Sequence, residues 1–443
     1  MQYAGRKKGI KMKIAWFKKN ISPEIGAFIA GYSLNDKSVA KLDDLYACGM
    51  CADDGTNKIL LISLDLIGLD GWYIRKIRKA CADILHIPEH AVMLSCTHTH
   101  TGPESRSIAG HPEKVHTAYL EKLETTLIDA VAGLTDFREC EVSFYSCKCD
   151  ENRNRRYVSG DNRATFTPHR REVLPGATEF ADQELGAIYF YDAATKLPVY
   201  AIGNYAAHPL AGHAPGLGGL RISADYPGAF RNYVTSNTGA ETMFVSGAAG
   251  DLVPKEDELG EDAMRGMGVR LGKEFIGGMI ESRRNPRRYG LPDAKVGSCI
   301  KPFKVRLRKH YANQAERMPE EYLGSDDVTL EIQCISIGDV CFVGVPGELC
   351  CELGQEIKWH SPFRRTFIAY SATAYICYIV PANFLVSGGY EPICQCFTAK
   401  GGLTLLNTAV DAMFDLHETI YPSEGEPYPD GCFGGVVNIL PNR

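Results

Sequence analysis

The chain has 443 residues, and its 48 lysines and arginines against 54 aspartates and glutamates give a net charge of −6 with neutral histidines. A hydrophobic content of 45% and a charged content of 23% are those of an ordinary globular protein and exclude intrinsic disorder. The mildly negative charge does not indicate nucleic acid or an anionic membrane as a partner, and no stretch reaches the ~18 uninterrupted apolar residues of a transmembrane helix. We therefore expect a soluble protein with a well-formed core and no stable membrane insertion.

The N-terminus and the cysteines indicate a reducing compartment. No apolar segment follows the basic residues near the start, so we expect no signal peptide, and Met12 is a second candidate start. Several of the sixteen cysteines lie in apolar, strand-like runs, where a thiol behaves as a small buried hydrophobe. Cys48 and Cys51, like Cys394 and Cys396, lack a second Cys/His pair at zinc-finger spacing, so we do not expect a structural zinc site. We predict reduced thiols and a cytoplasmic location.

Strands and helices alternate along most of the chain. Alternation of apolar and polar residues over 58–66 predicts a half-buried strand, and a 3.6-residue period over 73–85 predicts a helix. The runs 328–337 and 340–345 predict a hairpin, because Gly-Asp at 338–339 separates them. The other predicted strands are 13–17, 91–96, 141–149, 185–191, 198–205, 244–246 and 366–371, and the other predicted helices are 115–134, 262–282 and 403–417.

Two long stretches without periodicity interrupt this pattern, at 152–179 and 211–222. Loops of this length in a compact domain are usually functional. The chain contains no internal repeat, no low-complexity tract and no linker between two composition regimes. We therefore predict a single mixed α/β (α+β) domain over residues 12–443, in which helices flank β-sheets, with an irregular segment after Ile420.

Unusual polar groups follow four of the predicted strands, and the first is the run Thr97-His-Thr-His-Thr-Gly-Pro103. The two-residue period of an extended chain places His98 and His100 on the same face, and Gly-Pro then forces a turn. Two imidazoles at a strand end suit a metal ligand with an acid–base partner. The alternative is a pair of hydrogen-bonded surface histidines.

The other three strand ends offer an imidazole, a glycine-rich turn and a carboxylate. His208 follows the strand 198–205 and is either a core histidine or a ligand. The turn 247–251 either offers backbone N–H groups to an anion or oxyanion, or is a tight turn capped by an aspartate. Glu348 lies at the start of a predicted helix, where a glutamate is normally a cap. Sites in open α/β sheets form outside the carboxyl ends of strands, so the four ends together predict one site.

These motifs and their order resemble those of the neutral/alkaline (non-lysosomal) ceramidase family. The run 97–103 is similar to the family's His-Thr-His-Ser-Gly-Pro motif. Cys377-Tyr378 is followed twelve positions later by Tyr390-Glu391, which is similar to the family's Gly-Tyr and Tyr-Glu-Gly elements at the same separation. Between them, in the family's order, come Ala207-His208-Pro209, Gly250-Asp251 and Pro346-Gly347-Glu348. The resemblance extends from about residue 60 to 395.

The resemblance implies the fold of a ceramidase catalytic domain and hydrolysis of an amide bond by metal-activated water. Carried over position by position, it implies a Zn²⁺ ion held by His98, His208, Glu348 and Tyr378. It also implies that His100 shuttles protons or fixes geometry, and that Tyr390 donates a hydrogen bond to the developing oxyanion. Arg155 is the implied active-site arginine, with Arg153 as the alternative.

Several features depart from the family pattern. Val253 occupies the position of a family serine and cannot act as a nucleophile, whereas attack by water needs no serine. Cys377 and Pro392 replace family glycines, which predicts a reshaped pocket. The chain ends about where the catalytic domain should, so we expect no C-terminal immunoglobulin-like domain and a substrate other than ceramide. Our hypothesis is a cytoplasmic zinc hydrolase that cleaves an amide bond in a small, water-soluble substrate. The alternatives are a zinc hydrolase or lyase acting on an ester or carbohydrate-linked bond, and a catalytically inactive binding homologue.

Overall fold

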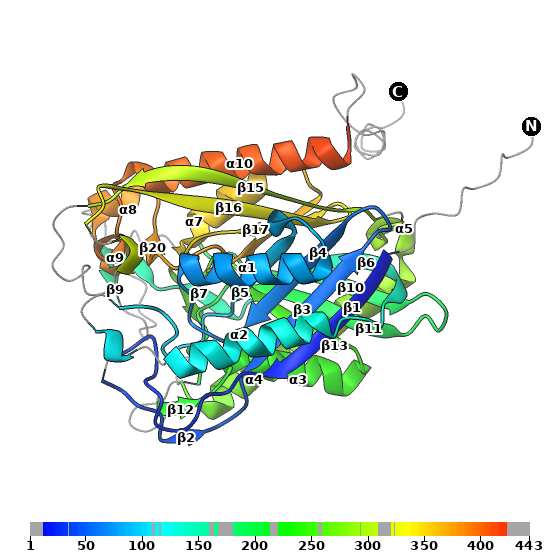
Figure 1. Cartoon of the computed structure of the whole chain (residues 1–443), viewed down its shortest axis with the longest axis horizontal. Helices are drawn as coiled ribbons and strands as arrows, with labels where there is room; N and C mark the ends of the chain where they lie inside the picture. The colour runs from blue at the N-terminus through cyan, green and yellow to red at the C-terminus, as the bar shows by residue number, and fades with distance from the viewer. Residues whose placement is uncertain are drawn as a thin grey trace, which may run out of the picture.

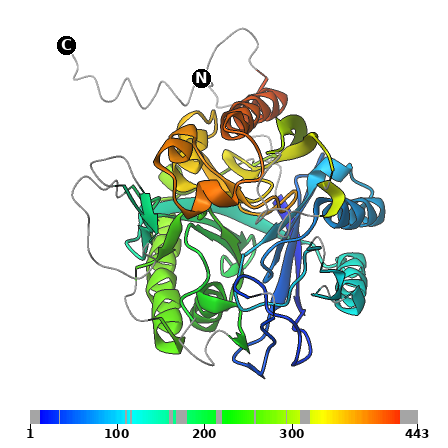
Figure 2. The same cartoon turned by 90° about the vertical axis from the view of Figure 1, so that its left-hand side faces the viewer.

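Two large β-sheets lie face to face between layers of helices (Figures 1 and 2). The computed structural model describes residues 12–33, 35–108, 111–114, 117–158, 164–166, 180–212, 220–255, 259–292, 294–308, 320–322 and 324–422. Within these ranges the arrangement confirms the predicted mixed α/β class.

The larger sheet contains eight strands. They are β1 (Met12–Asn20), β3 (Tyr46–Asp53), β4 (Lys58–Leu64), β5 (Val92–Cys96), β6 (Arg138–Lys148), β10 (Glu184–Asp192), β11 (Pro198–Tyr205) and β13 (Glu241–Ser246). Their order across the sheet is β13-β11-β10-β6-β1-β3-β4-β5, and the pairs β4/β5 and β11/β13 are parallel. The half-buried strand predicted over 58–66 is wrong in its exposure: every residue of β4 after Lys58 is buried, because the sheet is covered on both faces.

The smaller sheet packs on one face of the larger one. Its strands, in order, are β15 (Val296–Arg306), β16 (Asp327–Ile337), β17 (Val340–Gly344) and β19 (Arg365–Ala369). Phe342 and Phe367 from this sheet share one apolar core with Ile188 and Phe190 from the larger sheet. The predicted hairpin is confirmed: β16 and β17 pair tightly around Gly338, whose φ of 56° costs glycine little.

Helices cover the two outer faces. On the larger sheet, α1 (Gly71–Leu85) and α2 (Thr117–Ala132) pack over β1, β3, β4 and β5, and α3 (Asp225–Thr238) and α4 (Glu261–Arg284) pack over β10, β11 and β13 (Figure 2). On the smaller sheet, α7 (Cys351–Trp359) and α10 (Lys400–Ile420) provide the cover (Figure 1). The long helices predicted from periodicity are therefore confirmed, with ends that shift by a few residues.

The larger sheet curves until its opposite edges approach each other. Ser246 Oγ, at the end of β13, donates to the Thr97 carbonyl just after β5, at 2.7 Å. Ser63 Oγ in β4 donates to the Phe244 carbonyl in β13 at 2.6 Å. This curvature brings the carboxyl ends of β5, β11 and β13 to one region, although β5 and β13 are the two edge strands of the sheet.

The two predicted loops contain short strands in the part that the structure describes. The first contains β7 (Asn152–Asn154), β8 (Arg156–Val158) and β9 (Ala164–Phe166), and β7 pairs with β14 (Leu252–Pro254). The second ends in β12 (Arg221–Ile222). Residues 159–163, 167–179 and 213–219 of these loops lie outside the described ranges, as do residues 423–443 of the predicted C-terminal segment.

The described residues also bear on two predictions that were made from the composition. No helix among the described residues combines the length and apolar character that crossing a bilayer requires. The cysteines placed there are all free thiols. Cys48 and Cys51 lie three apart in β3 and face different cores, so they do not form a joint site. Burial raises the pKa of Cys48 to about 11 and that of Cys51 to about 12.

Candidate active site

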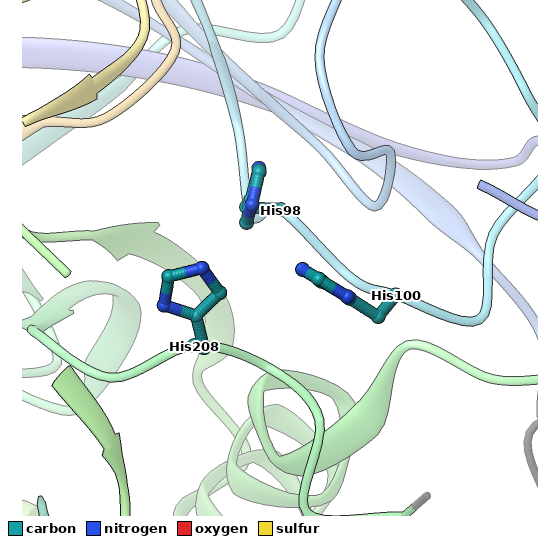
Figure 3. Close-up of side chains that lie close together, drawn as sticks. All are labelled: His98, His100 and His208. Atoms are coloured by element: carbon teal, nitrogen blue, oxygen red, sulfur yellow. The ribbon is translucent and has the colours of Figure 1, made fainter. Parts of the chain in front are cut away.

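Three imidazoles converge at the carboxyl ends of β5 and β11. His98 and His100 follow β5, His208 follows β11, and Figure 3 shows the three rings pointing toward one another. One ring nitrogen from each histidine lies within 4.8 Å of the other two. All three side chains are buried. The group could therefore bind a metal ion.

The backbone at His98 is not the extended chain that we predicted. β5 ends at Cys96, and His98 has a φ of 69°, in the left-handed region. The predicted same-face geometry is thus wrong, although the predicted convergence of His98 and His100 is correct. Gly31 lies directly against the His100 ring, because a Cβ at that glycine would lie 2.6 Å from His100 Nδ1.

Hydrogen bonds to backbone carbonyls orient two of the rings. His98 Nδ1 donates to the Ile67 carbonyl at 2.7 Å, and His208 Nδ1 donates to the Leu252 carbonyl at 3.0 Å. Each Nε2 is therefore an acceptor, the state in which imidazole binds a metal. Glu348 Oε2 lies 3.4 Å from His98 Nε2 and 3.2 Å from His208 Nε2. Ligand atoms on one tetrahedral zinc lie about 3.3–3.6 Å apart, so the spacing fits.

Several nitrogens of the group are buried without a hydrogen-bond partner among the described residues. They are His98 Nε2 and both ring nitrogens of His100. Buried polar atoms normally find partners, so these atoms are consistent with a ligand between the rings. Burial holds the pKa of His100 well below its ordinary value and lowers the pKa of His208 to about 4. The resulting neutral imidazole is the form that binds a metal.

Glu348 lies in a strand and not at a helix start, which corrects the sequence prediction. It forms β18 (Glu348–Leu349), which pairs in parallel with β20 (Tyr378–Ile379), so that Glu348 and Tyr378 are direct partners in register. Helix α7 begins only at Cys351. Gly347 makes the turn possible, because its φ is 145° and a Cβ there would lie 2.5 Å from the Cys377 carbonyl oxygen. Strand pairing thus directs the Glu348 carboxylate.

Two tyrosines that sequence reasoning missed hold the Glu348 carboxylate. The Tyr375 hydroxyl donates to Oε1, and the Tyr370 hydroxyl donates to Oε2 at 3.3 Å. Burial alone would raise the pKa of Glu348, but the adjacent His98 and His208 hold that pKa well below its ordinary value. Both tyrosines lie at or just beyond the end of the strand predicted over 366–371, so the rule applied to the other strand ends could have found them.

A second buried cluster contains Arg155. Its Nη2 donates to the Tyr378 hydroxyl and to the Gly250 carbonyl, both at 2.9 Å, and its Nε donates to Glu391 Oε1 at 2.8 Å. Arg156 Nη1 donates to Glu391 Oε2 at 2.9 Å. Burial raises the pKa of Tyr378 well above its ordinary value, and the Arg155 guanidinium opposes that shift. The Tyr390 ring lies 5.5 Å from the Tyr378 ring, between centroids.

The alternative arginine and the valine lie beside this cluster. Arg153 is in β7 and pairs with Val253 of β14, whereas Arg155 reaches Tyr378. Val253 is buried and does not line the cavity described below. The two glycine N–H groups of the turn 247–251 donate to carbonyls, at 2.9 Å each. The suggestion that these two groups bind an anion is therefore wrong, and Gly250 instead offers its carbonyl to Arg155.

A cavity of about 350 Å³ opens onto both clusters. This volume is at the small end of the range for ligand sites. Five of the predicted site residues line it: His98, His100, Glu348, Tyr378 and Tyr390. The wall also includes Glu104, Arg106 and Tyr375, none of which was predicted.

Known proteins share this fold. No protein-family model matches the chain, and a search of curated proteins also gives no match. Among solved structures, a neutral ceramidase from Pseudomonas aeruginosa matches with a TM-score of 0.75 and 16% sequence identity, over 96% of this chain and 77% of that chain. A ceramidase complexed with C2 matches with a TM-score of 0.75 and 15% identity, over 95% of this chain and 77% of that chain. The ceramidase-like fold that the motifs predicted is confirmed.

Proposed function

We propose that this protein is a zinc-dependent hydrolase that cleaves an amide (N-acyl) bond in a small-molecule substrate. One observation carries the proposal: His98 and His208 direct their Nε2 atoms toward a common point beside Glu348, at the wall of a cavity. The ceramidase-like fold supports the choice of an amide bond.

The ligand set that we propose combines imidazole, carboxylate and phenolate donors, which suit zinc. Its members are His98, His208, Glu348 and Tyr378. When bound, the ion lowers the pKa of a coordinated water toward ~7 and polarises the substrate carbonyl. Tyr370 and Tyr375 fix the Glu348 carboxylate, and Arg155 stabilises negative charge on the Tyr378 oxygen through its hydrogen bond.

Two further residues have roles in the reaction that we propose. His100 is neutral, buried and adjacent to the ligands, so its ring can take a proton from the attacking water and return one to the leaving amine nitrogen. Tyr390 lines the cavity beside Tyr378, where its hydroxyl can donate to the carbonyl oxygen as negative charge develops. The cavity of about 350 Å³ favours a small N-acyl compound over ceramide.

We also propose a cytoplasmic location. The many buried free thiols support it, because reducing compartments keep cysteines unpaired. Thiol titration of freshly prepared protein in denaturant, without reductant, should find nearly all 16 cysteines free. Several disulfides would contradict the location.

A reconstitution assay tests the reaction. The metal is removed with a chelator and Zn²⁺ is restored, and both forms are tested against N-acyl amines, esters and glycosides that carry matched groups. We expect amine release from at least one amide, only with the restored metal. Cleavage of esters or glycosides without cleavage of any amide would contradict the proposed bond.

A further inference from the structure

The cavity wall contains an arginine that the proposed reaction does not use. Arg106 follows the segment that carries His98 and His100, and its side chain forms a two-pronged ion pair with Glu104. Nε donates to Glu104 Oε1 at 2.8 Å, and Nη2 donates to Oε2 at 2.7 Å. The Arg106 backbone N–H donates to the same carboxylate at 3.1 Å. Such a paired fork fixes the orientation of the guanidinium group.

An aromatic ring places this guanidinium next to the candidate metal ligands. Arg106 Cζ lies 4.4 Å from the centre of the Tyr375 ring. The Tyr375 ring stacks on His98, with 6.0 Å between ring centres, and its hydroxyl donates to Glu348. The guanidinium can thus be no farther from the His98 ring centre than the sum of these two distances. One tyrosine separates Arg106 from the site of reaction.

One guanidinium nitrogen of Arg106 keeps its donors free. Glu104 occupies Nε and Nη2, and Nη1 makes no hydrogen bond within the described part of the chain. Arg106 lines the cavity, and its side chain is 15% exposed, so Nη1 is not sealed in the core. A fixed guanidinium with free N–H groups at a cavity wall is suited to bind a planar anion.

We propose that Arg106 binds a carboxylate of the substrate, so that the substrates are amides with a carboxylate a few bonds from the cleaved bond, such as N-acyl amino acids. The choice of an amide rests on the proposed function, whereas the carboxylate site does not. Arg106 is then a residue that determines specificity, and Glu104 limits the affinity of the site because its negative charge opposes that of the substrate carboxylate.

Binding of ligands that cannot be hydrolysed tests the proposal on the full-length protein as purified. In 4-oxo-4-phenylbutanoate, a CH₂ group replaces the amide nitrogen and the carboxylate is on the amine half. In 4-oxo-5-phenylpentanoate, the carboxylate is on the acyl half. Each is compared with its own primary amide by calorimetry or ligand-observed NMR. We expect one of the two carboxylates to bind at least about tenfold more tightly than its amide.

A carboxylate that binds the metal directly would also bind more tightly than its amide. Variants of Arg106 distinguish the two cases, because they leave contact between the carboxylate and the metal unchanged. Arg106→Gln should abolish the preference for carboxylate over amide, and Glu104→Gln should increase it. The double variant Glu104→Gln with Arg106→Gln avoids an unpaired buried carboxylate and should also lack the preference. Circular dichroism and thermal melting confirm the fold of each variant.

Equal affinity for carboxylate and amide in both pairs would overturn the proposal, and so would a preference that Arg106→Gln leaves intact. A carboxylate preference that depends on Arg106, in a protein that cleaves no amide, would keep the anion site and reject the proposed reaction. The two proposals can therefore fail separately.

Discussion

Two clusters of buried polar side chains meet at the cavity, and they differ in how their atoms are paired. In the histidine cluster of His98, His100 and His208, three ring nitrogens have no hydrogen-bond partner among the described residues. In the arginine cluster, both oxygens of Glu391 accept a hydrogen bond from a guanidinium, one from Arg155 and one from Arg156, although Arg156 Nε lacks a partner among the described residues.

This difference indicates that buried polar side chains have two different roles in this molecule. Unpaired buried nitrogens are costly unless something binds them, so the histidine cluster could bind a metal ion between its rings. Paired buried charges satisfy each other and become costly when one partner is removed. We therefore expect changes in the histidine cluster to affect metal binding and activity, and a break in the arginine cluster to affect stability first.

The largest effect should come from His208→Ala. Loss of a direct ligand should reduce activity well beyond the ~10–100-fold typical of an outer-sphere change, while the fold persists because the ring contributes little to the apolar core. Kinetic constants with the best substrate from the screen, together with a thermal melt, measure both effects. His90→Ala is the matched control, since His90 is exposed and its side chain hydrogen-bonds only to Ser298 Oγ among the described residues. Wild-type activity in His208→Ala would reject the ligand assignment.

The next largest effect concerns stability and the arginine cluster. Glu391→Gln leaves two buried guanidinium groups short of their counterion and should lower the free energy of unfolding by about 3–5 kcal/mol. Glu141→Gln is the control: Glu141 also bridges two cations, Lys196 and Arg283, but its side chain is 48% exposed, so the loss should stay below about 1 kcal/mol. Urea unfolding measures both. Equal losses in the two variants would contradict the claim that burial makes the ion pairs of Glu391 costly to break.

Tyr390→Phe should have a smaller effect, and on turnover alone. Removal of one donor to a developing oxyanion costs about 3 kcal/mol, so kcat should fall about a hundredfold with little change in KM. Tyr289→Phe provides the control, because Tyr289 ends α5 (Pro286–Tyr289) and does not line the cavity. An unchanged kcat in Tyr390→Phe would show that another group stabilises the oxyanion.

Val253→Ser should have the smallest effect. The side chain is buried opposite Arg153 and away from the cavity, so the new hydroxyl should change kcat/KM by less than about fivefold, the scale of one hydrogen bond. Steady-state kinetics suffice to measure this. A gain of about a hundredfold would indicate that a serine nucleophile, rather than water, attacks the substrate.

The sequence predicts local features better than the geometry of the site. Strong periodicity and the Gly338 turn locate the hairpin and the long helices, because these signals act between near neighbours. The positive φ of His98 occurs together with a hydrogen bond from its side chain to the Ile67 carbonyl, 31 residues earlier, a contact that no local pattern reveals. The local sequence predicts that Glu348 caps a helix, because its strand partner, Tyr378, is distant in the sequence.

The position of Arg106 also depends on contacts between residues that are distant in the sequence. Its closeness to the reaction site depends on Tyr375, which lies far away in the sequence and near in space. Pairings of this kind arise from the curvature of the larger sheet and from the way that the smaller sheet packs on it. A local pattern contains no information about either.

Metal content tests the central claim most directly. Elemental analysis of the purified protein, after chelation and reconstitution with Zn²⁺, should find about one zinc per chain in the wild type and in His90→Ala, and less than about a tenth of that in His208→Ala. A wild-type protein that binds no metal, or a His208→Ala protein that keeps one zinc per chain, would contradict the claim that the histidine cluster and Glu348 form a metal site.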